Sequence, residues 1–381
     1  MSDEITLTVA TCTLNAAAKL GDETFTKSNI RKISGWINLR ATRGIERCPS
    51  DFEVSYTEPY PAVADVQVQE GDWVQVQLGN DLILTGFVDR CQTSITSASH
   101  SLRITGRSKC QDLVDCGTSG QVLNMPVDKI AEVLCNPFGI KVNVATGTNI
   151  GGPINQFLVV AGETPYAALE LVCRYRALLL YDQPDGSLMI AAGGSANTTG
   201  PLAIGTRVAA SGFTEGINVQ EMSLTRAMDG RYSRYDAVYQ GLDTFQDTGD
   251  GGNLVATVTD PTVPRYRYRV IISEQVTGGA VVAEQRANWE MAYRMGRSYQ
   301  VRLTTDSWRD SAGVLYEPNT LVDIDLPGLK LEKKRWLIAE VTYLRSARGT
   351  FAQLVIVPPQ AFYQEPIVLN PVSPDVSQVS Q

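Results

Sequence analysis

The sequence predicts an α+β protein that is mostly β, with a small α+β domain inserted between two β-rich parts. Short apolar or alternating segments, separated by Gly, Asn, Asp and Pro, recur at both ends of the chain. Apolar residues at helical spacing are concentrated in the middle. A hairpin pattern that starts at Glu70 returns in weaker form from Glu317. These three observations carry the prediction.

Composition limits the classes of function. The 381 residues are enough for two or three domains, and 43% hydrophobic with 19% charged residues is typical of a folded chain. The net charge of −8 argues against nonspecific nucleic-acid binding, which needs a basic surface. No apolar run reaches the length of a membrane span, and the first residues lack a basic signal-peptide region. We therefore expect no membrane insertion by this chain.

The N-terminal part contains strand-like segments bounded by turn residues. They are FEVSY (52–56), WVQVQL (73–78), LILTGFV (82–88) and SLRIT (101–105).

The character changes after Gly106. PVDKIAEVLC has helical spacing behind Pro126, and Thr164 followed by Pro165 marks the start of a second helix. ALLLYDQPDGSLMIA (177–191) predicts a hairpin around a Pro-Asp-Gly turn. We expect a compact α+β block here, and a long helix later, in VVAEQRANWEMAYRMGRSY (281–299).

The two hairpin patterns align strand by strand. The alternating trio Val74, Val76 and Leu78 matches Val322, Ile324 and Leu326, 248 positions later. The next matches pair Leu84, Gly86 and Val88 with Leu337, Ala339 and Val341 (offset 253), and Leu102 and Ile104 with Leu354 and Ile356 (offset 252). These matches predict an internal duplication, although any two antiparallel sheets share such alternation.

A duplicated sheet unit has a geometric use. Three chains with two units each would place six similar units around one axis, because head-to-tail contacts close into rings. Such a ring could join a hexameric structure to a trimeric one.

Several segments resemble the baseplate hub proteins of contractile-tailed bacteriophages, in the Mu-like and P2-like late-control D branch, which is related to the hub part of type VI secretion spike proteins. The resemblance covers the chain from its first strand to Phe362. It is carried by RGIERCPSDFEVSY (43–56), EGDWVQVQLGNDLILTGFVD (70–89), GRSKCQDLVDC (106–116), INQFLVVAGETPYAALELVCRYRALLLYDQPDGSLMI (154–190), GVLYEPNTLVDIDLPGL (313–329) and LIAEVTYLRSARGTFAQLVIVPPQAF (337–362).

The resemblance implies two tail-tube-like β-barrel domains with the α+β domain inserted. We expect the first barrel in residues 1–109 plus 200–240, the insert in 110–199, the second barrel in 241–362, and a flexible tail in 363–381.

The resemblance also implies function, location and partners. It predicts a structural hub in the virion tail baseplate, assembled in the host cytoplasm as a homotrimeric ring. The ring would adapt a trimeric central spike to the six-fold tail tube, contact the tube or tube-initiator protein and baseplate wedge proteins, and let DNA pass. The chain stops soon after Phe362, so we expect the spike to be a separate polypeptide.

No pattern predicts catalysis, a cofactor or a metal. The single histidine, His100, lies in a polar turn without a nucleophile motif, and no phosphate-binding glycine loop occurs. Seven cysteines without a C-x-x-C pair predict scattered thiols in a reducing cytosol. We therefore expect no enzyme and no catalytic, cofactor or metal site.

Two groups are candidate contact residues. In RYRYR, a strand would place Arg265, Arg267 and Arg269 on one face and both tyrosines on the other; we favour inward tyrosines, or a subunit contact, over nucleic-acid binding. Asp323 and Asp325 could face a channel lumen and repel DNA phosphates, or lie on an ordinary solvated face.

Two alternatives remain open. A type VI secretion hub is disfavoured because no fused spike follows. A carbohydrate-binding or glycan-degrading β protein is the other alternative. A stack of exposed tryptophans would favour it, but the five tryptophans here are scattered along the sequence.

Overall fold

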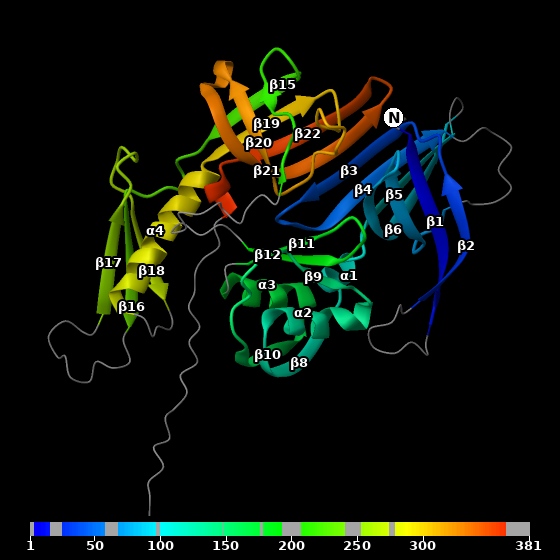
Figure 1. Cartoon of the computed structure of the whole chain (residues 1–381). Helices are drawn as coiled ribbons and strands as arrows, with labels where there is room; N and C mark the ends of the chain where they lie inside the picture. The colour runs from blue at the N-terminus through cyan, green and yellow to red at the C-terminus, as the bar shows by residue number, and fades with distance from the viewer. Residues whose placement is uncertain are drawn as a thin grey trace, which may run out of the picture.

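The computed structural model describes residues 4–15, 25–57, 68–96, 100–146, 148–175, 178–192, 207–240, 253–273 and 279–362. Figure 1 shows a long sheet, an α+β domain beneath its centre, and a lobe built on helix α4 (Gly279–Arg297). Strands predominate, so the predicted mostly-β α+β class is confirmed.

The long sheet contains two units of strands. The N-terminal unit comprises β1 (Ile5–Leu14), β2 (Phe25–Ile33), β3 (Asn38–Gly44), β4 (Arg47–Thr57), β5 (Trp73–Leu78), β6 (Asp81–Ile95) and β7 (His100–Ser108). The C-terminal unit comprises β13 (Arg207–Val208), β14 (Phe213–Thr214), β15 (Glu221–Arg226), β19 (Tyr299–Thr305), β20 (Thr320–Leu326), β21 (Leu331–Ser346) and β22 (Gly349–Val357), with 3-10 turns at Pro327–Leu329 and Pro359–Phe362.

Both units share one strand order. The hydrogen-bonded path is β15-β19-β22-β21-β3-β4-β7-β6-β5-β1-β2, and β20 also pairs with β21. The order β3-β4-β7-β6-β5 therefore recurs as β15-β19-β22-β21-β20. Alternation buries Val74, Val76 and Leu78 in a core that also contains Val322, Ile324 and Leu326, as predicted.

Irregular positions repeat as well. A bulge interrupts the β6–β7 register between Val88 and Arg90, and another interrupts β21–β22 between Ile338 and Glu340. Before each unit's hairpin, a residue with positive φ donates its N–H to the bulged strand: Gly71 to Val88 O at 2.8 Å, and Asn319 to Ile338 O at 2.9 Å. Shared order and shared irregularities support an internal duplication.

The predicted register of the repeat is correct for one strand and wrong for two. Val74 pairs with Gly86 in the first hairpin, and Val322 pairs with Trp336 in the second. The predicted offset of 248 between β5 and β20 is therefore correct. In the next strand, however, Gly86 corresponds to Trp336 and not to Ala339. The equivalent bulges and residue pairs give an offset of 250 positions from β6 to β21, and the same offset from β7 to β22. The alternation of β21 misled the alignment because Trp336, Leu337 and Ile338 are all buried: Leu337 faces a second cluster that includes Trp289 of α4.

The predicted closed barrels are not found among the described strands. The path ends at β15 and β2, and β21 pairs with β3 of the other unit, so the two units form one open sheet. The prediction assigned residues 200–240 to the first, N-terminal domain, but the strands within 207–226 belong to the C-terminal unit. Strands β13 and β14 pair with β20 and β15 pairs with β19, all in the C-terminal unit, because each completes an edge there.

The central α+β domain follows the predicted local signals. It contains α1 (Gln111–Asp115), β8 (Thr118–Met125), α2 (Val127–Cys135), a 3-10 turn (Asn136–Phe138), β9 (Val142–Val144), β10 (Ile154–Glu163), α3 (Pro165–Tyr175), β11 (Leu178–Asp182) and β12 (Leu188–Ala192). Thr164 Oγ1 accepts the N–H of Ala167 at 3.2 Å, as expected of a helix cap. Its own apolar cluster includes Ile130, Leu169 and Ile190.

The lobe packs a three-stranded sheet on α4. Its order is β17 (Asn253–Thr259), β16 (Arg234–Gln240) and β18 (Tyr268–Ser273), and Tyr235 and Ala237 pack with Ala287 of α4. Within the residues that the structure describes, no helix has the length and apolar character needed to cross a membrane.

Gly86→Ala should destabilise the N-terminal unit. A Cβ at Gly86 would lie 1.9 Å from Arg107 O of the neighbouring strand, so β6 and β7 would have to separate. We expect a loss of about 1–3 kcal/mol in unfolding free energy by urea titration. Gly230→Ala, whose Cβ meets nothing within 4 Å, is the control. Equal stabilities of the two variants would contradict the close packing of β6 on β7.

Candidate functional site: the polar face of the long sheet

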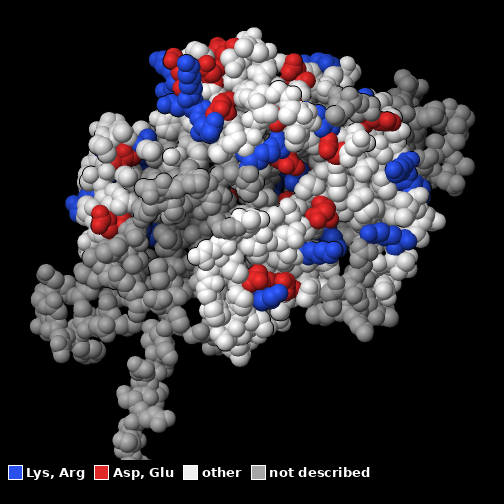
Figure 2. Space-filling view, in the orientation of Figure 1, with Lys and Arg blue, Asp and Glu red and all other residues white. Residues whose placement is uncertain are grey.

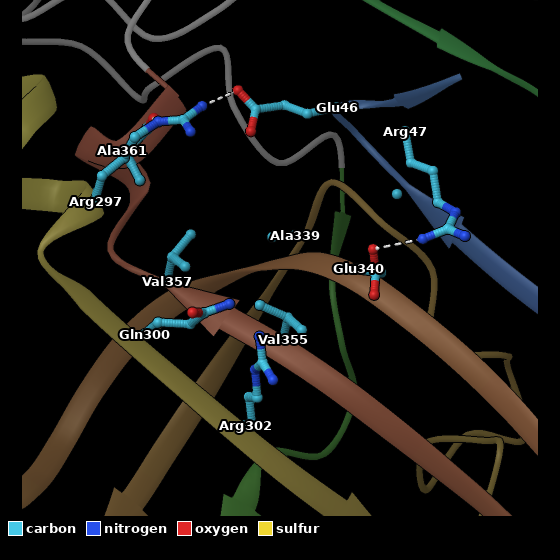
Figure 3. A pocket seen from close by; sticks show the side chains of 11 residues that line it. Glu46, Arg47, Arg297, Gln300, Arg302, Ala339, Glu340, Val355, Val357 and Ala361 are labelled. Carbon is cyan, nitrogen blue, oxygen red and sulfur yellow. Dashed lines mark hydrogen bonds and ion pairs between the residues drawn. The ribbon is translucent and has the colours of Figure 1, made fainter. Parts of the chain in front are cut away.

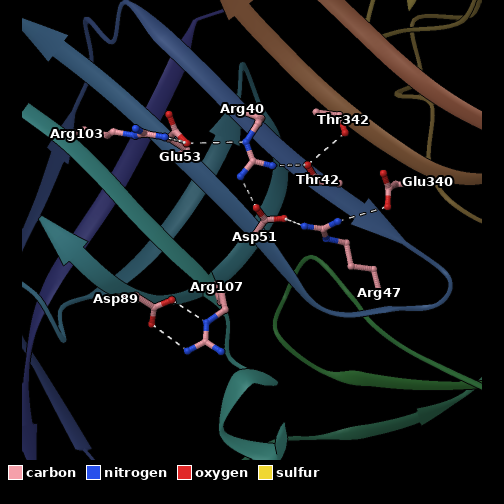
Figure 4. A network of polar contacts seen from close by, with 10 residues as sticks. All are labelled: Arg40, Thr42, Arg47, Asp51, Glu53, Asp89, Arg103, Arg107, Glu340 and Thr342. Atoms are coloured by element: carbon pink, nitrogen blue, oxygen red, sulfur yellow. Dashed lines mark hydrogen bonds and ion pairs between the residues drawn. The ribbon is translucent and has the colours of Figure 1, made fainter. Parts of the chain in front are cut away.

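The face of the sheet opposite the core carries paired charges. On β3, β4, β6 and β7, outward-facing residues form ion pairs (Figure 4): Arg40–Asp51 at 2.5 Å, Arg47–Asp51 at 2.7 Å, Arg103–Glu53 at 2.7 Å and Arg107–Asp89 at 2.7 Å. Such half-exposed pairs contribute little stability, roughly 0–1 kcal/mol each. Their main effect is to cancel charge over a wide polar surface.

The same face crosses the junction between the units. Thr42 of β3 and Thr342 of β21 place their hydroxyl oxygens 3.2 Å apart, and Arg47 reaches Glu340 at 3.5 Å. Polar contacts therefore run without interruption from one unit to the other.

Three hollows follow this face, and we call them, together with the ion pairs described above, the polar trough. One of about 730 Å³ lies over β4, β6 and β7 and is lined by Arg107 and Arg47. A second, of about 300 Å³, shares Arg47 with the first and contains Arg302 and Glu340 (Figure 3). A third, of about 460 Å³, shares Arg302 and Glu340 with the second and reaches Glu221 on β15. Because neighbouring hollows share lining residues, they lie side by side along the face.

One wall of the middle hollow holds a partly desolvated acid. Glu46 contacts Arg297 of α4 (Figure 3), yet burial raises the pKa of Glu46 despite that cation. Among the described residues no group of three or more His, Cys, Asp or Glu could hold a metal ion. His100 opens β7, where it pairs with Ile95. The trough therefore offers a surface on which acidic and basic side chains alternate.

A buried carboxyl anchors the central domain beneath the sheet. Asp182 of β11 accepts the Ser50 N–H at 3.1 Å and the Ser50 hydroxyl at 2.9 Å, across 132 positions of sequence. Burial raises the pKa of Asp182, while Arg43 and Ser50 oppose the rise.

The structure places the predicted acids on the outer face of β20. Asp323 is 60% exposed and forms a bidentate pair with Arg335 at 2.7 and 2.9 Å, which lowers the pKa of Asp323. Asp325 is half-buried on the same strand. The negative charge of Asp323 is thus compensated locally, which the sequence did not indicate.

The predicted RYRYR strand is only partly correct. Strand β18 begins at Tyr268, and the tyrosines point outward: Tyr266 is 76% and Tyr268 45% exposed, with rings stacked 6.3 Å apart. The expectation of inward tyrosines is wrong because the inner face of the lobe sheet is already filled by Tyr235 and Ala237 against α4.

The three arginines of this segment have different surroundings. Arg267 donates to Arg231 O at 2.7 Å, Arg269 donates to Glu290 at 3.2 Å, and both guanidinium groups lie over the Tyr232 ring. Arg265 is exposed. The arginines at 267 and 269 therefore help to hold the lobe together.

Sequence reasoning missed the trough. Its signal was present as opposite charges at alternate positions of separate strands, Asp51 and Glu53 against Arg103 and Arg107. Only the pairing of β4 with β7 brings them together, and that pairing is not written in either segment alone.

Comparisons with known proteins agree with this architecture. Three family models match successive parts of the chain: the Mu phage baseplate assembly protein GpP-like N-terminal domain over 27–108, the second domain of baseplate hub protein gp44-like over 110–192, and the GpP fourth domain over 279–365. Baseplate hub protein gp44 of Escherichia phage Mu is 27% identical over 347 residues, covering 88% of each chain.

Solved structures give the same picture. The 43 kDa tail protein of prophage MuSo2 from Shewanella oneidensis has a TM-score of 0.77 at 26% identity, covering 95% of this chain and 99% of that one. A tail protein from Neisseria meningitidis MC58 shares the fold, with a TM-score of 0.71 at 17% identity over 95% and 98% of the chains.

Fold and matches define a phage tail protein built from two like sheet units. More specifically, the chain belongs to the family of Mu-like baseplate hub proteins, and its location is the tail baseplate of the virion.

Changing Asp182 should separate its burial cost from its hydrogen bonds. Because burial raises the pKa of Asp182, the folded protein holds this proton at pH values where the unfolded chain, with an Asp pKa of about 4, has lost it. The free energy of unfolding should therefore fall as the pH rises from about 4 through the raised pKa of the folded state. Asp182→Asn should remove this slope and match or exceed the wild type at neutral pH. Asp182→Ala should lose about 1–3 kcal/mol, because the Ser50 N–H and hydroxyl lose their acceptor.

Urea unfolding at several pH values checks both variants. If Asp182→Asn unfolded as easily as Asp182→Ala, or kept the wild-type slope, the assigned role of Asp182 would be wrong.

Proposed function

We propose that three copies of this hub form a ring that adapts a three-fold spike to the six-fold tail tube. The observation that carries this proposal is the repeated strand order, β3-β4-β7-β6-β5 and β15-β19-β22-β21-β20, within one continuous sheet. Three chains then supply six similar units, and head-to-tail contacts close into a ring.

The polar trough is the surface proposed to line the channel. Four of its arginines, Arg40, Arg47, Arg103 and Arg107, are matched by carboxylates. Asp323 and Asp325 lie on the same side of the sheet, away from the core. Acidic and basic residues are intermixed on the face drawn in Figure 2. A wall of balanced charge would neither hold nor strongly repel the phosphates of passing DNA. The role of the hub would be structural and not enzymatic.

The proposed partners are a trimeric central spike, the tube or tube-initiator protein, and baseplate wedge proteins. The fold is also found in an E. coli type VI secretion component (TM-score 0.50, 10% identity), whose description states similarity to the T4 tail proteins gp27 and gp5. That likeness supports the proposal of a spike partner through the fold alone. Arg265, Arg267 and Arg269 stay a proposed subunit or partner contact, with Arg265 and the exposed Tyr266 as the freely presented groups.

The ring can be tested by mass in solution. Light scattering of the hub alone and mixed with its candidate spike should give a species of three 41.5 kDa chains, which binds one spike trimer. A stable monomer or dimer in the presence of the spike would contradict the proposed ring.

The channel can be tested by unbalancing its charge. Glu53→Gln removes the partner of Arg103 and leaves a cation on the proposed channel wall, so phage carrying it should eject DNA more slowly, with relief at higher salt. Glu132→Gln removes the partner of Lys129, also a pair at 2.7 Å, on the central domain and serves as the control. Equal ejection by both variants and the wild type would argue against the trough as the channel wall.

A further inference from the structure

Besides the outer edge of β2, the long sheet has unpartnered edges on β6 and β15 among the described residues. Strand β6 pairs with β7 from Gly86 to Ile95. On its other edge, β5 pairs as far as Phe87 and the backbone of residues 71–72 bonds to Val88, so Arg90–Ile95 has a free edge there among the described residues. Strand β15 pairs with β19 on one side only. Free edges present rows of N–H and C=O groups that can accept another strand.

Inside the chain, the corresponding edge is occupied. Strand β21, the counterpart of β6, pairs with β20 through Leu337 and then, along the same edge, with β3 from Glu340 to Arg345. Strand β3 is the counterpart of β15, because both take the outer place beside β4 and β19. The internal junction β21–β3 thus has a vacant counterpart, β6 with β15.

The repeat fixes the register of the vacant junction. Thr225 holds the same position in the β15–β19 pairing as Thr42 holds in the β3–β4 pairing. Counted from the equivalent bulges, Gln92 of β6 is the counterpart of Thr342 of β21. The observed pair Thr342–Thr42 therefore becomes Gln92–Thr225. The full set is Arg90–Ala227, Cys91–Arg226, Gln92–Thr225, Thr93–Leu224, Ser94–Ser223 and Ile95–Met222.

We propose that β15 of one hub chain adds antiparallel to Arg90–Ile95 of a second copy in this register. The contact rests on the three-chain ring proposed above and makes it specific: the sheet would continue from chain to chain around the ring.

Side chains on the two edges fit this pairing. On the core side, Ile95, which is 68% exposed, would meet Met222, and Thr93 would meet Leu224; Met222 and Leu224 already pack on the core of their unit. On the other side, Ser94 would meet Ser223. No pair in the register opposes like charges.

Charge complementarity supports the same partner. Arg226 takes the position of Arg43, which pairs with Glu317 at 3.5 Å beside the internal junction. Across the proposed junction Arg226 would face Cys91. Burial, Glu70 and Asp72 raise the pKa of Cys91 to about 11, so acidic groups lie close to that thiol. Cys91 Sγ lies 3.7 Å from Val68 O, and the Gly71 N–H bonds to Val88 O at 2.8 Å. Glu70, which is exposed and lies between Val68 and Gly71, is therefore beside the proposed junction and would receive Arg226 of the neighbour.

Cysteine cross-linking tests the contact at its closest predicted pair. Gln92→Cys with Thr225→Cys in one chain should oxidise, under diamide, to dimers and closed trimers on non-reducing gels. Thr42→Cys with Thr342→Cys, the internal counterpart at 3.2 Å, should link within one chain and is the positive control. Mixing the single variants Gln92→Cys and Thr225→Cys should give linked pairs only, and each single variant alone should give none above the wild type.

The outcomes separate this inference from the ring itself. Trimers by light scattering with cross-linked chains support the contact. If trimers form but only the internal control pair becomes cross-linked, the proposed contact is wrong and the ring itself is not affected. Absence of trimers with the spike present overturns both.

A charge exchange gives an independent readout. Arg226→Glu should weaken trimer assembly at least about tenfold, equivalent to about 1.4 kcal/mol, and adding Glu70→Arg should restore much of it. Weakening that Glu70→Arg does not relieve would overturn the assigned Arg226–Glu70 contact.

Discussion

The pairing of β3 with β21 is the contact on which the architecture depends. It joins segments 300 positions apart through six register pairs, from Glu340–Gly44 to Arg345–Leu39. Without it each unit would keep a free edge and its own separate core. With it, one core spans both units and the polar trough crosses from one to the other. Arg43 with Glu317 and Arg47 with Glu340 secure the junction on its two sides.

In the proposed ring, duplication would let one chain serve two symmetries. In each unit a long bulged strand, β6 or β21, lies next to the strand at the end of the order, β5 or β20. In each unit a residue with positive φ, Gly71 or Asn319, precedes the hairpin and donates its N–H to the bulged strand. Bulges bend and twist strands, so bulges at equivalent places would bend both units in the same direction. Curvature shared by two units is what a ring of near-equivalent parts requires.

Local signals in the sequence were enough for much of the fold. Helix α3 starts where Thr164 and Pro165 mark it, and strands with strict alternation, such as β5 and β20, were predicted in position and in buried face. Pairing was harder. Leu337 broke the alternation of β21 because α4, distant in sequence, covers its outer face, and this shifted the alignment by three residues. The two-residue strands β13 and β14 leave no periodic signal, so their place in the C-terminal unit could not be predicted.

The trough shows the same limit for function. Each of its charges looks like an ordinary solvated residue in its own strand, and only antiparallel pairing assembles Arg103 with Glu53 and Arg40 with Asp51. The duplicated hairpin pattern and the family resemblance gave the right class of protein, whereas the surface through which it would work needed three dimensions.

An electron cryo-microscopy reconstruction of the hub bound to its tube, calculated without imposed symmetry, tests the central claim most directly. The account predicts three chains whose six sheet units sit at nearly equal rotations about the tube axis, with the trough facing the channel. Units clustered in three unequal pairs, or troughs turned away from the axis, would contradict it.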